Sequence, residues 1–332
     1  MNQLTYCSAC VLPNTFPNIN FDADGVCNFC RNNDISQKQN TFDLAPFNEL
    51  VEAVRNKSDW DALVCYSGGK DSTFILQWLK ESYNLNILSF TLDNGFLADT
   101  AKSNINYVTS QLGVDHIFFK PSMIFQKKMF QAAMTDDLNR YKGSYQTRIS
   151  DTCLSCISLV NNTAVKLSIR FRIPLILAGF TPGQVPKSII QQPQSMTNSH
   201  FEAHRDHYEK HLGKAAESYM KVPETDNQVY LVSPFLMINY NESDILNSIK
   251  HLGWDEPDKI DGCTSNCRLN GVGNLIHMKR YGFHPYALEL SILVRNKMMT
   301  REHAFSKLQK NIAPEEVNNI IETLDISQSA IK

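Results

Sequence analysis

Residues 65–74 read CYSGGKDSTF and place a glycine pair between two segments of different character. The run before them, 61–66, is short and apolar, as in a buried strand, whereas the run after them, 72–83, has apolar residues at helical spacing. The glycines therefore fall in a strand-to-helix turn, where the unpaired N–H groups of a helix N-terminus are exposed. Such a turn binds anions, and phosphate is the usual one.

The same alternation of elements continues along the chain. Strand-like runs at 86–92, 116–119, 173–178 and 229–232 alternate with helical patterns at 98–112, 122–140 and 154–170. Strands alternating with helices predict βαβ units and a parallel sheet, in which ligands bind beyond the carboxyl ends of the strands. Residues 181–228 are polar with scattered Pro and His, as in a flexible lid or insertion, and the chain reads as helical again from residue 243.

Length and composition restrict the class of protein. The chain has 332 residues, of which 42% are hydrophobic and 20% charged, enough for a full core in one large domain or two. The start, MNQLTYCSAC, is not a secretory signal, and no apolar run approaches the ~20 residues of a membrane span, so we expect a cytoplasmic protein. A net charge of −2 favours a small-molecule or carrier-bound substrate over nucleic acid, with tRNA kept as an alternative.

The glycine turn does not match the Walker pattern, G-x-x-x-x-G-K-[ST]. Instead, SGGKDS at 67–72 resembles the PP-loop of the N-type ATP pyrophosphatases. The resemblance implies a Rossmann-like doubly wound α/β sheet. It also implies an enzyme that cleaves ATP between the α and β phosphates, adenylates a carbonyl-type oxygen of its substrate and releases pyrophosphate.

The residue types of the turn suit this chemistry. Gly68 and Gly69 let the backbone approach phosphate closely. Lys70 brings positive charge to the leaving pyrophosphate, and Asp71 is a candidate ligand of Mg²⁺. Further ATP contacts are expected from the hydroxyl groups of Ser67, Ser72 and Thr73. The alternative is an ordinary glycine turn with a helix cap.

Two other strand ends are candidate nucleotide contacts. By the superfamily resemblance, Asp93 in LDNGF and its neighbour Asn94 hold the adenosine, although an Asn-Gly turn explains the same residues. Gly179 in LAGFTPGQ opens a glycine-rich loop that often supplies an acidic residue in relatives. No carboxylate follows here, where the chain has Thr181, Gly183 and Gln184.

Nine cysteines in an unsecreted chain favour metal binding or catalysis over disulfides. Cys7-x-x-Cys10 and Cys27-x-x-Cys30 have the spacing of a zinc ribbon, in which four thiolates close a tetrahedral structural Zn²⁺ site. We therefore expect a zinc ribbon and linker at 1–42, a PP-loop ATP pyrophosphatase domain at 43–240 and a helical region at 241–332.

The remaining cysteine pattern indicates chemistry near the ATP site. Cys153-x-x-Cys156, followed by Cys263 and Cys267, resembles the tRNA thiouridine synthetases of the PP-loop superfamily. This resemblance implies a [4Fe–4S] cluster on Cys153, Cys156 and one of the two later cysteines, with one iron open to bind sulfide. The alternatives are a second zinc site on all four, a persulfide-carrying redox pair, or buried structural thiols. For catalysis we select Lys70, Asp71, Cys153, Cys156 and Cys263.

A second resemblance indicates a different nucleophile. YCSACVLPNTFPNINFDADGVCNFC at the N-terminus and VRNKMMTREHAF near the C-terminus resemble the N-acetyl sugar amidotransferases of surface-polysaccharide synthesis. Members of that family take ammonia from a separate glutaminase. In this chain, the segments DGCTSNCRLN and GFHPYALELS depart from the family's sequence pattern. Both resemblances share adenylation of a carbonyl or amide oxygen. We expect that this oxygen is then replaced by sulfur from a donor, with ammonia-derived nitrogen as the alternative. We also expect the enzyme to be a homo-oligomer. A third possibility is a non-catalytic zinc-ribbon scaffold that senses ATP.

Overall fold

The computed structural model describes residues 3–32, 42–135, 138 and 148–327. Its centre is a six-stranded sheet in the order β3-β2-β1-β4-β6-β5. All neighbouring strands are parallel except β5 and β6, which are antiparallel. The predicted α/β fold is confirmed, and its sheet is parallel as expected except for the antiparallel edge strand β5. The strands are β1 (Ala62–Cys65), β2 (Ile87–Leu92), β3 (Asp115–Phe119), β4 (Leu175–Ala178), β5 (Ile189–Gln191) and β6 (Tyr230–Val232).

The helices follow the apolar periodicity of the sequence to within a few residues. The helix after the glycine turn starts at Lys70. The helix expected at 154–170 starts earlier, at Asp151, because the Ser150 hydroxyl caps it by accepting a hydrogen bond from the N–H of Cys153 at 3.3 Å. The described helices are α1 (Asn28–Arg31), α2 (Ala45–Val54), α3 (Lys70–Tyr83), α4 (Asp99–Leu112), α5 (Met123–Thr135), α6 (Asp151–Phe171), α7 (Pro193–Ala203), α8 (Arg205–Leu212), α9 (Ala215–Met220), η2 (Pro234–Leu236), α10 (Glu242–Ile249), η3 (Lys250–Leu252), α11 (Leu269–Tyr281), α12 (Ala287–Arg295), α13 (Arg301–Gln309) and α14 (Pro314–Thr323). Part of the expected helix 122–140 lies outside the described residues.

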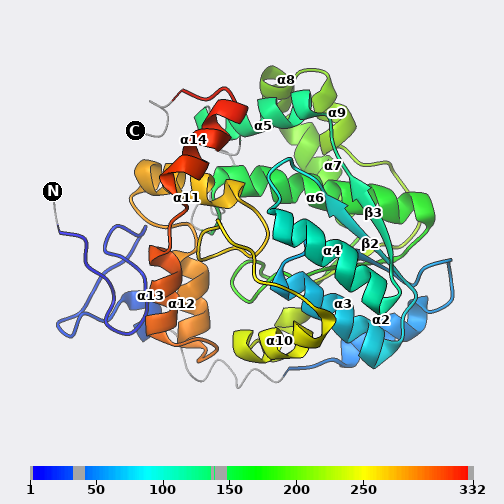
Figure 1. Cartoon of the computed structure of the whole chain (residues 1–332), viewed down its shortest axis with the longest axis horizontal. Helices are drawn as coiled ribbons and strands as arrows, with labels where there is room; N and C mark the ends of the chain where they lie inside the picture. Colours follow the sequence, from blue (N-terminus) through cyan, green and yellow to red (C-terminus); the bar gives the residue numbers. More distant parts are fainter. Residues whose placement is uncertain (1–2, 33–41, 136–137, 139–147, 328–332) are drawn as a thin grey trace.

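Helices cover both faces of the sheet. Successive side chains of β1 alternate between two hydrophobic clusters, since Leu63 belongs to one and Ala62 and Val64 to the other. The first cluster includes α5 and α6, and the second includes α3 and α4 (Figure 1). The sheet is therefore doubly wound.

The order of the strands determines where a ligand can bind. The chain moves from β1 to β2 and β3 on one side, and later returns to place β4 on the other side of β1. The crevice outside β1 and β4 is therefore the topological switch point, where open α/β sheets bind their ligands. Cys65 pairs with Ala178, so the loops that follow these two strands start side by side.

The polar stretch expected to form a flexible lid or insertion at 181–228 has a packed structure instead. It contains β5 and the helices α7, α8 and α9, and it buries Phe201 and Tyr208 in the same hydrophobic cluster as α5 and α6. The scattered Pro and His residues of this stretch therefore lie within and between short helices. Because α7 ends at Ala203 and α8 starts at Arg205, the histidines at 200, 204, 207 and 211 do not share one continuous helix.

The N-terminal cysteine-containing residues pack against helices from the C-terminal part of the chain. Residues 3–32 lie against α12 and α13 (Figure 1), with the rings of Phe16 and Phe283 5.0 Å apart. The Arg301 guanidinium donates hydrogen bonds to the backbone oxygens of Cys10 at 2.9 Å and Cys7 at 2.8 Å. Helices α12 and α13 thus connect the N-terminal cysteines to the rest of the fold.

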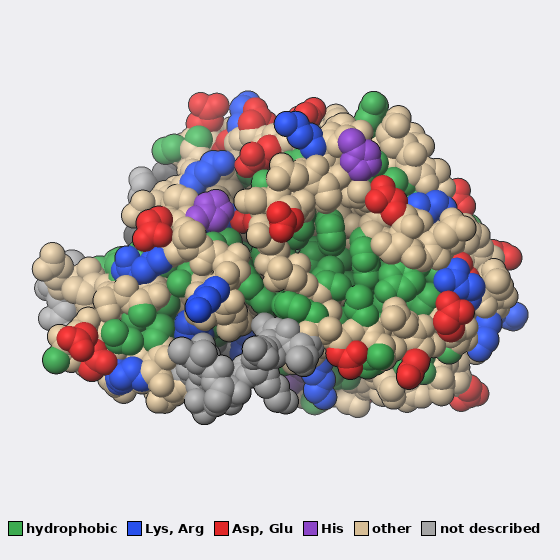
Figure 2. Space-filling model, turned by 90° about the horizontal axis from the view of Figure 1, so that it is seen from below, with side chains coloured by type: hydrophobic (Ala, Val, Ile, Leu, Met, Phe, Trp, Pro, Cys, Tyr) green, Lys and Arg blue, Asp and Glu red, His purple; other side chains and the backbone are tan. Residues whose placement is uncertain are grey.

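The surface carries charges of both signs. On the face shown in Figure 2, Lys and Arg side chains are interspersed with Asp and Glu, and hydrophobic side chains gather near its centre. None of the helices in the described part of the chain is long and apolar enough to cross a membrane.

Candidate functional site

The turn after β1 requires glycine. Gly68 has φ +75°, and a Cβ there would lie 2.3 Å from the backbone oxygen of Ala101. At the end of β4, a Cβ on Gly179 would lie 3.1 Å from the backbone nitrogen of Ser72. Gly68 therefore packs closely on α4, and the loop after β4 packs tightly on the start of α3.

Hydroxyl groups close the turn. The Ser72 hydroxyl accepts a hydrogen bond from the N–H of Ser67 at 3.2 Å and donates to the oxygen of Gly69 at 3.1 Å. The Thr73 hydroxyl donates to the same oxygen at 2.9 Å. These bonds hold the turn in place at the start of α3, with Gly69 in the N-cap position.

Lys70 lies in a network of polar side chains. Its Nζ is 2.7 Å from Asp71 Oδ2 and donates to the Tyr240 hydroxyl at 3.2 Å, and that hydroxyl donates to Asp71 Oδ1 at 3.2 Å. Burial alone would lower the pKa of Lys70, but the charges of Asp71 and its other neighbours raise it well above the ordinary value. Lys70 is therefore a fixed cation at the glycine turn.

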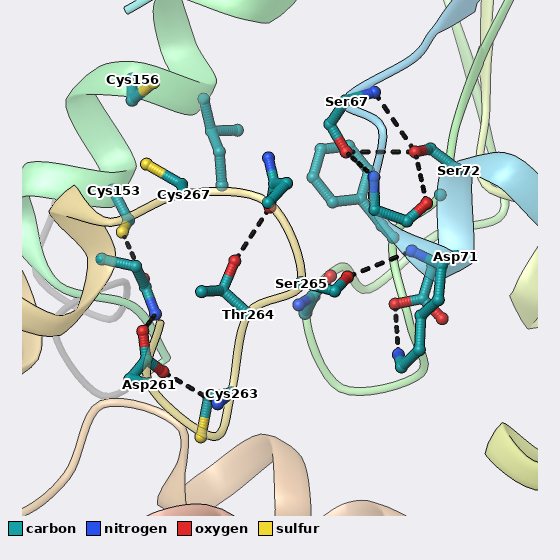
Figure 3. Close-up of a pocket in the computed structure, with 18 of the residues that line it drawn as sticks. Ser67, Asp71, Ser72, Cys153, Cys156, Asp261, Cys263, Thr264, Ser265 and Cys267 are labelled. Atoms are coloured by element: carbon teal, nitrogen blue, oxygen red, sulfur yellow. Dashed lines mark hydrogen bonds and ion pairs between the residues drawn. The ribbon is translucent and has the colours of Figure 1, made fainter. Parts of the chain in front are cut away.

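The segment 261–268, which carries Cys263 and Cys267, lies across this turn (Figure 3). The N–H of Lys70 donates to the Ser265 hydroxyl at 3.1 Å, the position where a helix N-terminus would bind an anion. The other side of the segment is held by backbone hydrogen bonds, from Ala98 to Asn266 at 2.9 Å and from Arg268 to Phe96 at 3.0 Å. Ser265 is a residue that the sequence analysis missed, although it lies in the DGCTSNC motif.

Three of the four cysteines near the turn face one another. Figure 3 shows the sulfurs of Cys153, Cys156 and Cys267 together, while Cys263 lies at the far side of Asp261 with its sulfur near the Lys307 backbone oxygen, 3.8 Å away. The Asn94 amide donates to the sulfurs of Cys156 at 3.6 Å and Cys267 at 3.4 Å. Its oxygen accepts the N–H of Phe96 at 2.9 Å, which determines the orientation of the amide.

The third sulfur has a different partner. The Cys153 thiol donates to Asn270 Oδ1 at 2.8 Å, and the Asn270 amide donates to Asp261 Oδ2 at 2.8 Å. Burial raises the pKa of Cys153 and Cys267, and it raises the pKa of Cys156 to about 12. The three thiols are therefore neutral as they stand, and binding a metal would release their protons.

The arrangement of these sulfurs bears on the metal they could hold. The sulfurs of Cys153, Cys156, Cys263 and Cys267 do not form a group within 4.8 Å of one another among the described residues, as ligands of a single ion would. Thiolates on separate irons of a cluster lie farther apart than thiolates on one ion. N–H donors to cysteine sulfur are also typical of clusters. The residues therefore fit a cluster better than a second zinc site.

One cavity of about 560 Å³ joins the two sets of groups. Its lining includes Ser67, Lys70 and Asp71 of the turn and all four of the cysteines Cys153, Cys156, Cys263 and Cys267. The glycine turn and the cysteines consequently open into one shared space.

The N-terminal cysteines form a separate group. The sulfurs of Cys7, Cys10, Cys27 and Cys30 all lie within 4.8 Å of one another, with Cys7–Cys30 at 3.9 Å and Cys10–Cys27 at 3.8 Å. Thiolates on zinc at about 2.3 Å in a tetrahedron are separated by about 3.8 Å, so the group fits Zn²⁺. The hydrogen bond between Cys10 and Cys30 lowers the pKa of Cys10 and raises the pKa of Cys30, and burial raises the pKa of Cys27. A metal bound by all four would therefore displace protons from the group. Arg295 approaches Cys10 Sγ at 3.9 Å and does not line the cavity.

Other positions differ from the expected roles. The Asp93 carboxylate accepts the N–H of Gly95 at 2.9 Å and lies 3.4 Å from Lys120 Nζ, and Asp93 is not among the residues that line the cavity. Conversely, Glu289 of α12 lies beside the loop after β4, where the sequence lacks a local carboxylate. Thr181 donates to its Oε1 at 2.5 Å, and burial raises the pKa of Glu289 to about 7. The only signal in the sequence is a lone acid in the apolar run ALELSILV.

Comparisons with known proteins give distant likenesses. No model of a known protein family matches the chain. It is 22% identical to the uncharacterized protein MJ1599 of Methanocaldococcus jannaschii over 94% of this chain and 95% of that protein. Among solved structures it is similar to the U34-tRNA thiolase NcsA from Methanococcus maripaludis with its [4Fe-4S] cluster. That match has a TM-score of 0.36 and 13% identity, and it covers 96% of this chain and 88% of that one.

Proposed function

We propose that the protein uses ATP to adenylate a carbonyl or amide oxygen of a small or carrier-bound substrate and then replaces that oxygen with sulfur. The observation that carries the proposal is the shared cavity, in which a PP-loop-like turn and three cysteine thiols face the same space. The glycine turn does not require the cysteines, and the cysteines do not require the turn. Because they come from distant parts of the chain and still line one cavity, their arrangement supports a reaction that uses both.

The first step is adenylation. The substrate oxygen attacks the α-phosphorus of ATP, the bond from that phosphorus to the bridging oxygen breaks, and pyrophosphate leaves. Lys70 and the N–H groups at the start of α3 stabilise the developing charge. Asp71 is the candidate ligand of the Mg²⁺ that accompanies ATP, because Mg²⁺ combines carboxylate and phosphate oxygens.

The second step is sulfur insertion. Cys153, Cys156 and Cys267 are the candidate ligands of a [4Fe–4S] cluster, and Cys263 is not, because its sulfur lies apart from theirs. With three protein ligands, such a cluster supplies a fourth iron at which sulfide can bind. Sulfur from a donor attacks the activated carbon, and AMP leaves with the original substrate oxygen. Asn94 orients two of the thiols through its amide.

The N-terminal thiolates have a structural part in this proposal. Cys7, Cys10, Cys27 and Cys30 hold Zn²⁺, which completes a unit too small to bury a core of its own. Arg301 connects this unit to α13, which faces the cavity through Lys307.

The adenylation step is tested with labelled ATP. The wild-type chain with Mg²⁺ is expected to release AMP and pyrophosphate in the presence of bulk tRNA or nucleotide N-acetyl sugars, used as trial substrates. Lys70→Ala should abolish AMP formation, while Lys221→Ala, which removes a lysine paired with Glu202 away from the cavity, should not. AMP formation by Lys70→Ala at the wild-type rate would overturn the ATP assignment.

The sulfur step is tested by anaerobic purification. Broad absorbance near ~400 nm with about four irons and four sulfides per chain is expected. Alanine at Cys153, Cys156 or Cys267 should remove the colour, while Cys263→Ala should keep it. A colourless wild-type protein that carries only zinc after cluster reconstitution would contradict sulfur insertion.

One observation favours the alternative nucleophile. The two segments that resemble N-acetyl sugar amidotransferases contact each other directly, since Arg301 binds the backbone of Cys7 and Cys10. In that case ammonia from a glutaminase would displace AMP and form an amidine on a nucleotide sugar. Incorporation of ¹⁵N from ammonia by a colourless, ATP-consuming protein would select this function. A gel shift with tRNA that weakens steeply with salt would instead restore tRNA as a candidate substrate.

A further inference from the structure

The carboxylate of Glu242 lies between cationic side chains from two other helices. Its Oε1 is 3.5 Å from Lys70 Nζ of α3 and 2.8 Å from Lys307 Nζ of α13. Its Oε2 is 3.2 Å from His303 Nε2, also on α13. The side chains of Lys70, Glu242 and Lys307 are only 11%, 14% and 17% exposed, so water screens this cluster weakly.

The cluster carries fixed charges. Burial would raise the pKa of Glu242, but the ammonium groups of Lys70 and Lys307 outweigh burial and lower the pKa to about 2. Glu242 is therefore an anion at neutral pH, and one of its oxygen atoms forms ion pairs with both lysines. A pair of ammonium groups that converge on one anionic oxygen is also the arrangement that a phosphate oxygen would need.

The position of Lys307 is held from two directions. Arg301, six residues or about 1.7 turns earlier on α13, binds the N-terminal cysteine unit. On the other side, Gly262 packs directly on the backbone of Lys307, since a Cβ at Gly262 would lie 2.3 Å from the Lys307 oxygen. Lys307 also lines the cavity that contains the phosphate turn. Its ammonium group is thus presented to the cavity by rigid elements.

We propose that Lys307 is a second phosphate-binding lysine, and that Glu242 Oε1 occupies the place of a phosphate oxygen between Lys70 and Lys307 until nucleotide binds. This inference rests on the proposed adenylation function and identifies which residues receive the pyrophosphate end of ATP. Pyrophosphate carries more negative charge than Lys70 can balance, because Asp71 already pairs with Lys70. The α13 helix supplies the additional cation.

Calorimetry with inorganic pyrophosphate and with AMP, each in Mg²⁺, tests the assignment. Lys307→Met is expected to weaken pyrophosphate binding at least about tenfold, about 1.4 kcal/mol, and to leave AMP binding within about twofold. Lys307→Arg should restore much of the loss. Glu242→Gln should strengthen pyrophosphate binding, because it removes the competing anion. Lys221→Met is the matched control, since its lysine pairs with Glu202 outside the cavity.

The outcomes separate this inference from the function on which it rests. Unchanged pyrophosphate binding in Lys307→Met, or an equal loss for AMP and pyrophosphate, would overturn the role of Lys307. Weaker pyrophosphate binding in Glu242→Gln would show that Glu242 positions the lysines rather than competing with the ligand. It would overturn the proposal that Glu242 Oε1 occupies the place of a phosphate oxygen. If the wild-type chain forms AMP from ATP, these results leave the adenylation function intact. A wild-type chain that binds neither ATP nor pyrophosphate would instead remove the proposed function itself.

Discussion

The indole N–H of Trp254 donates a hydrogen bond to the backbone oxygen of Gly68 at 2.9 Å, across a sequence separation of 186 residues. Trp254 is buried, and it also lines the cavity. A residue from the C-terminal half of the chain thus supports the glycine turn that follows the first strand. Nucleotide bound at this turn would alter the surroundings of the indole ring.

The fluorescence of Trp254 should therefore report nucleotide binding. Addition of ATP and Mg²⁺ is expected to change the tryptophan emission of the wild-type protein, and Trp254→Phe should abolish the change. Trp60→Phe should retain it, because the Trp60 indole bonds to Asp115 at the opposite end of the strands. A change that persists in Trp254→Phe would place the nucleotide elsewhere.

Substitution of Gly68 should be far more costly than substitution of another glycine with positive φ. Gly68→Ala adds a Cβ 2.3 Å from the Ala101 oxygen, whereas Gly113→Ala, with φ +59°, meets nothing within 4 Å. We expect Gly113→Ala to cost about 1–2 kcal/mol from backbone strain alone, and Gly68→Ala to cost roughly 3 kcal/mol or more. Urea unfolding compares the two variants, and equal losses would contradict the close contact.

Glu289 should make the stability of the protein fall as pH rises. Burial raises its pKa from an ordinary 4.5 to about 7 in the folded state, so its contribution is fully present below pH 4.5 and is lost as pH rises through 7. The loss amounts to roughly 3 kcal/mol at pH 8. Glu289→Gln should flatten this part of the profile while still accepting the Thr181 hydroxyl. Free energies of unfolding measured between pH 4.5 and 8 test this prediction, with substitution of an exposed residue, Glu49→Gln, as the control. Identical stability profiles for wild type and Glu289→Gln would contradict the role of Glu289.

Removal of one N-terminal thiolate should remove zinc and loosen the C-terminal helices. Cys10→Ser is expected to lose about one zinc per chain and several kcal/mol of stability, because the metal supplies much of the folding energy of such a unit. Cys263→Ser should keep the zinc, since its thiol is not part of the four-sulfur group. Metal analysis and thermal unfolding check both. Full zinc content in Cys10→Ser would show that other residues hold the metal.

Local patterns predicted those parts of the protein that depend on neighbouring residues. The glycine turn and its flanking strand and helix follow from residues 61–83, and the N-terminal cysteine group follows from two C-x-x-C pairs. The choice between Cys263 and Cys267 was not predictable. They are four residues apart on a loop whose path depends on backbone hydrogen bonds to Phe96 and Ala98.

Distant contacts also explain the other missed residues. Glu242 and Lys307 belong to separate helices without any recognisable motif, and only the packing of α10 and α13 brings them to Lys70. Glu289 reaches the loop after β4 from α12, more than a hundred residues later. The polar stretch 181–228 was misjudged because short helices with polar outer faces resemble a loop in composition.

The contact between Arg301 and Cys7, 294 residues apart, has a consequence for biosynthesis. At about 5–20 residues per second, the ribosome produces the docking partner of the N-terminal unit about 15 to 60 s after the unit itself. A polypeptide interrupted before residue 301 would have neither this anchor nor Lys307. Incomplete translation products would therefore expose an undocked N-terminal unit to proteases, and they would lack Lys307.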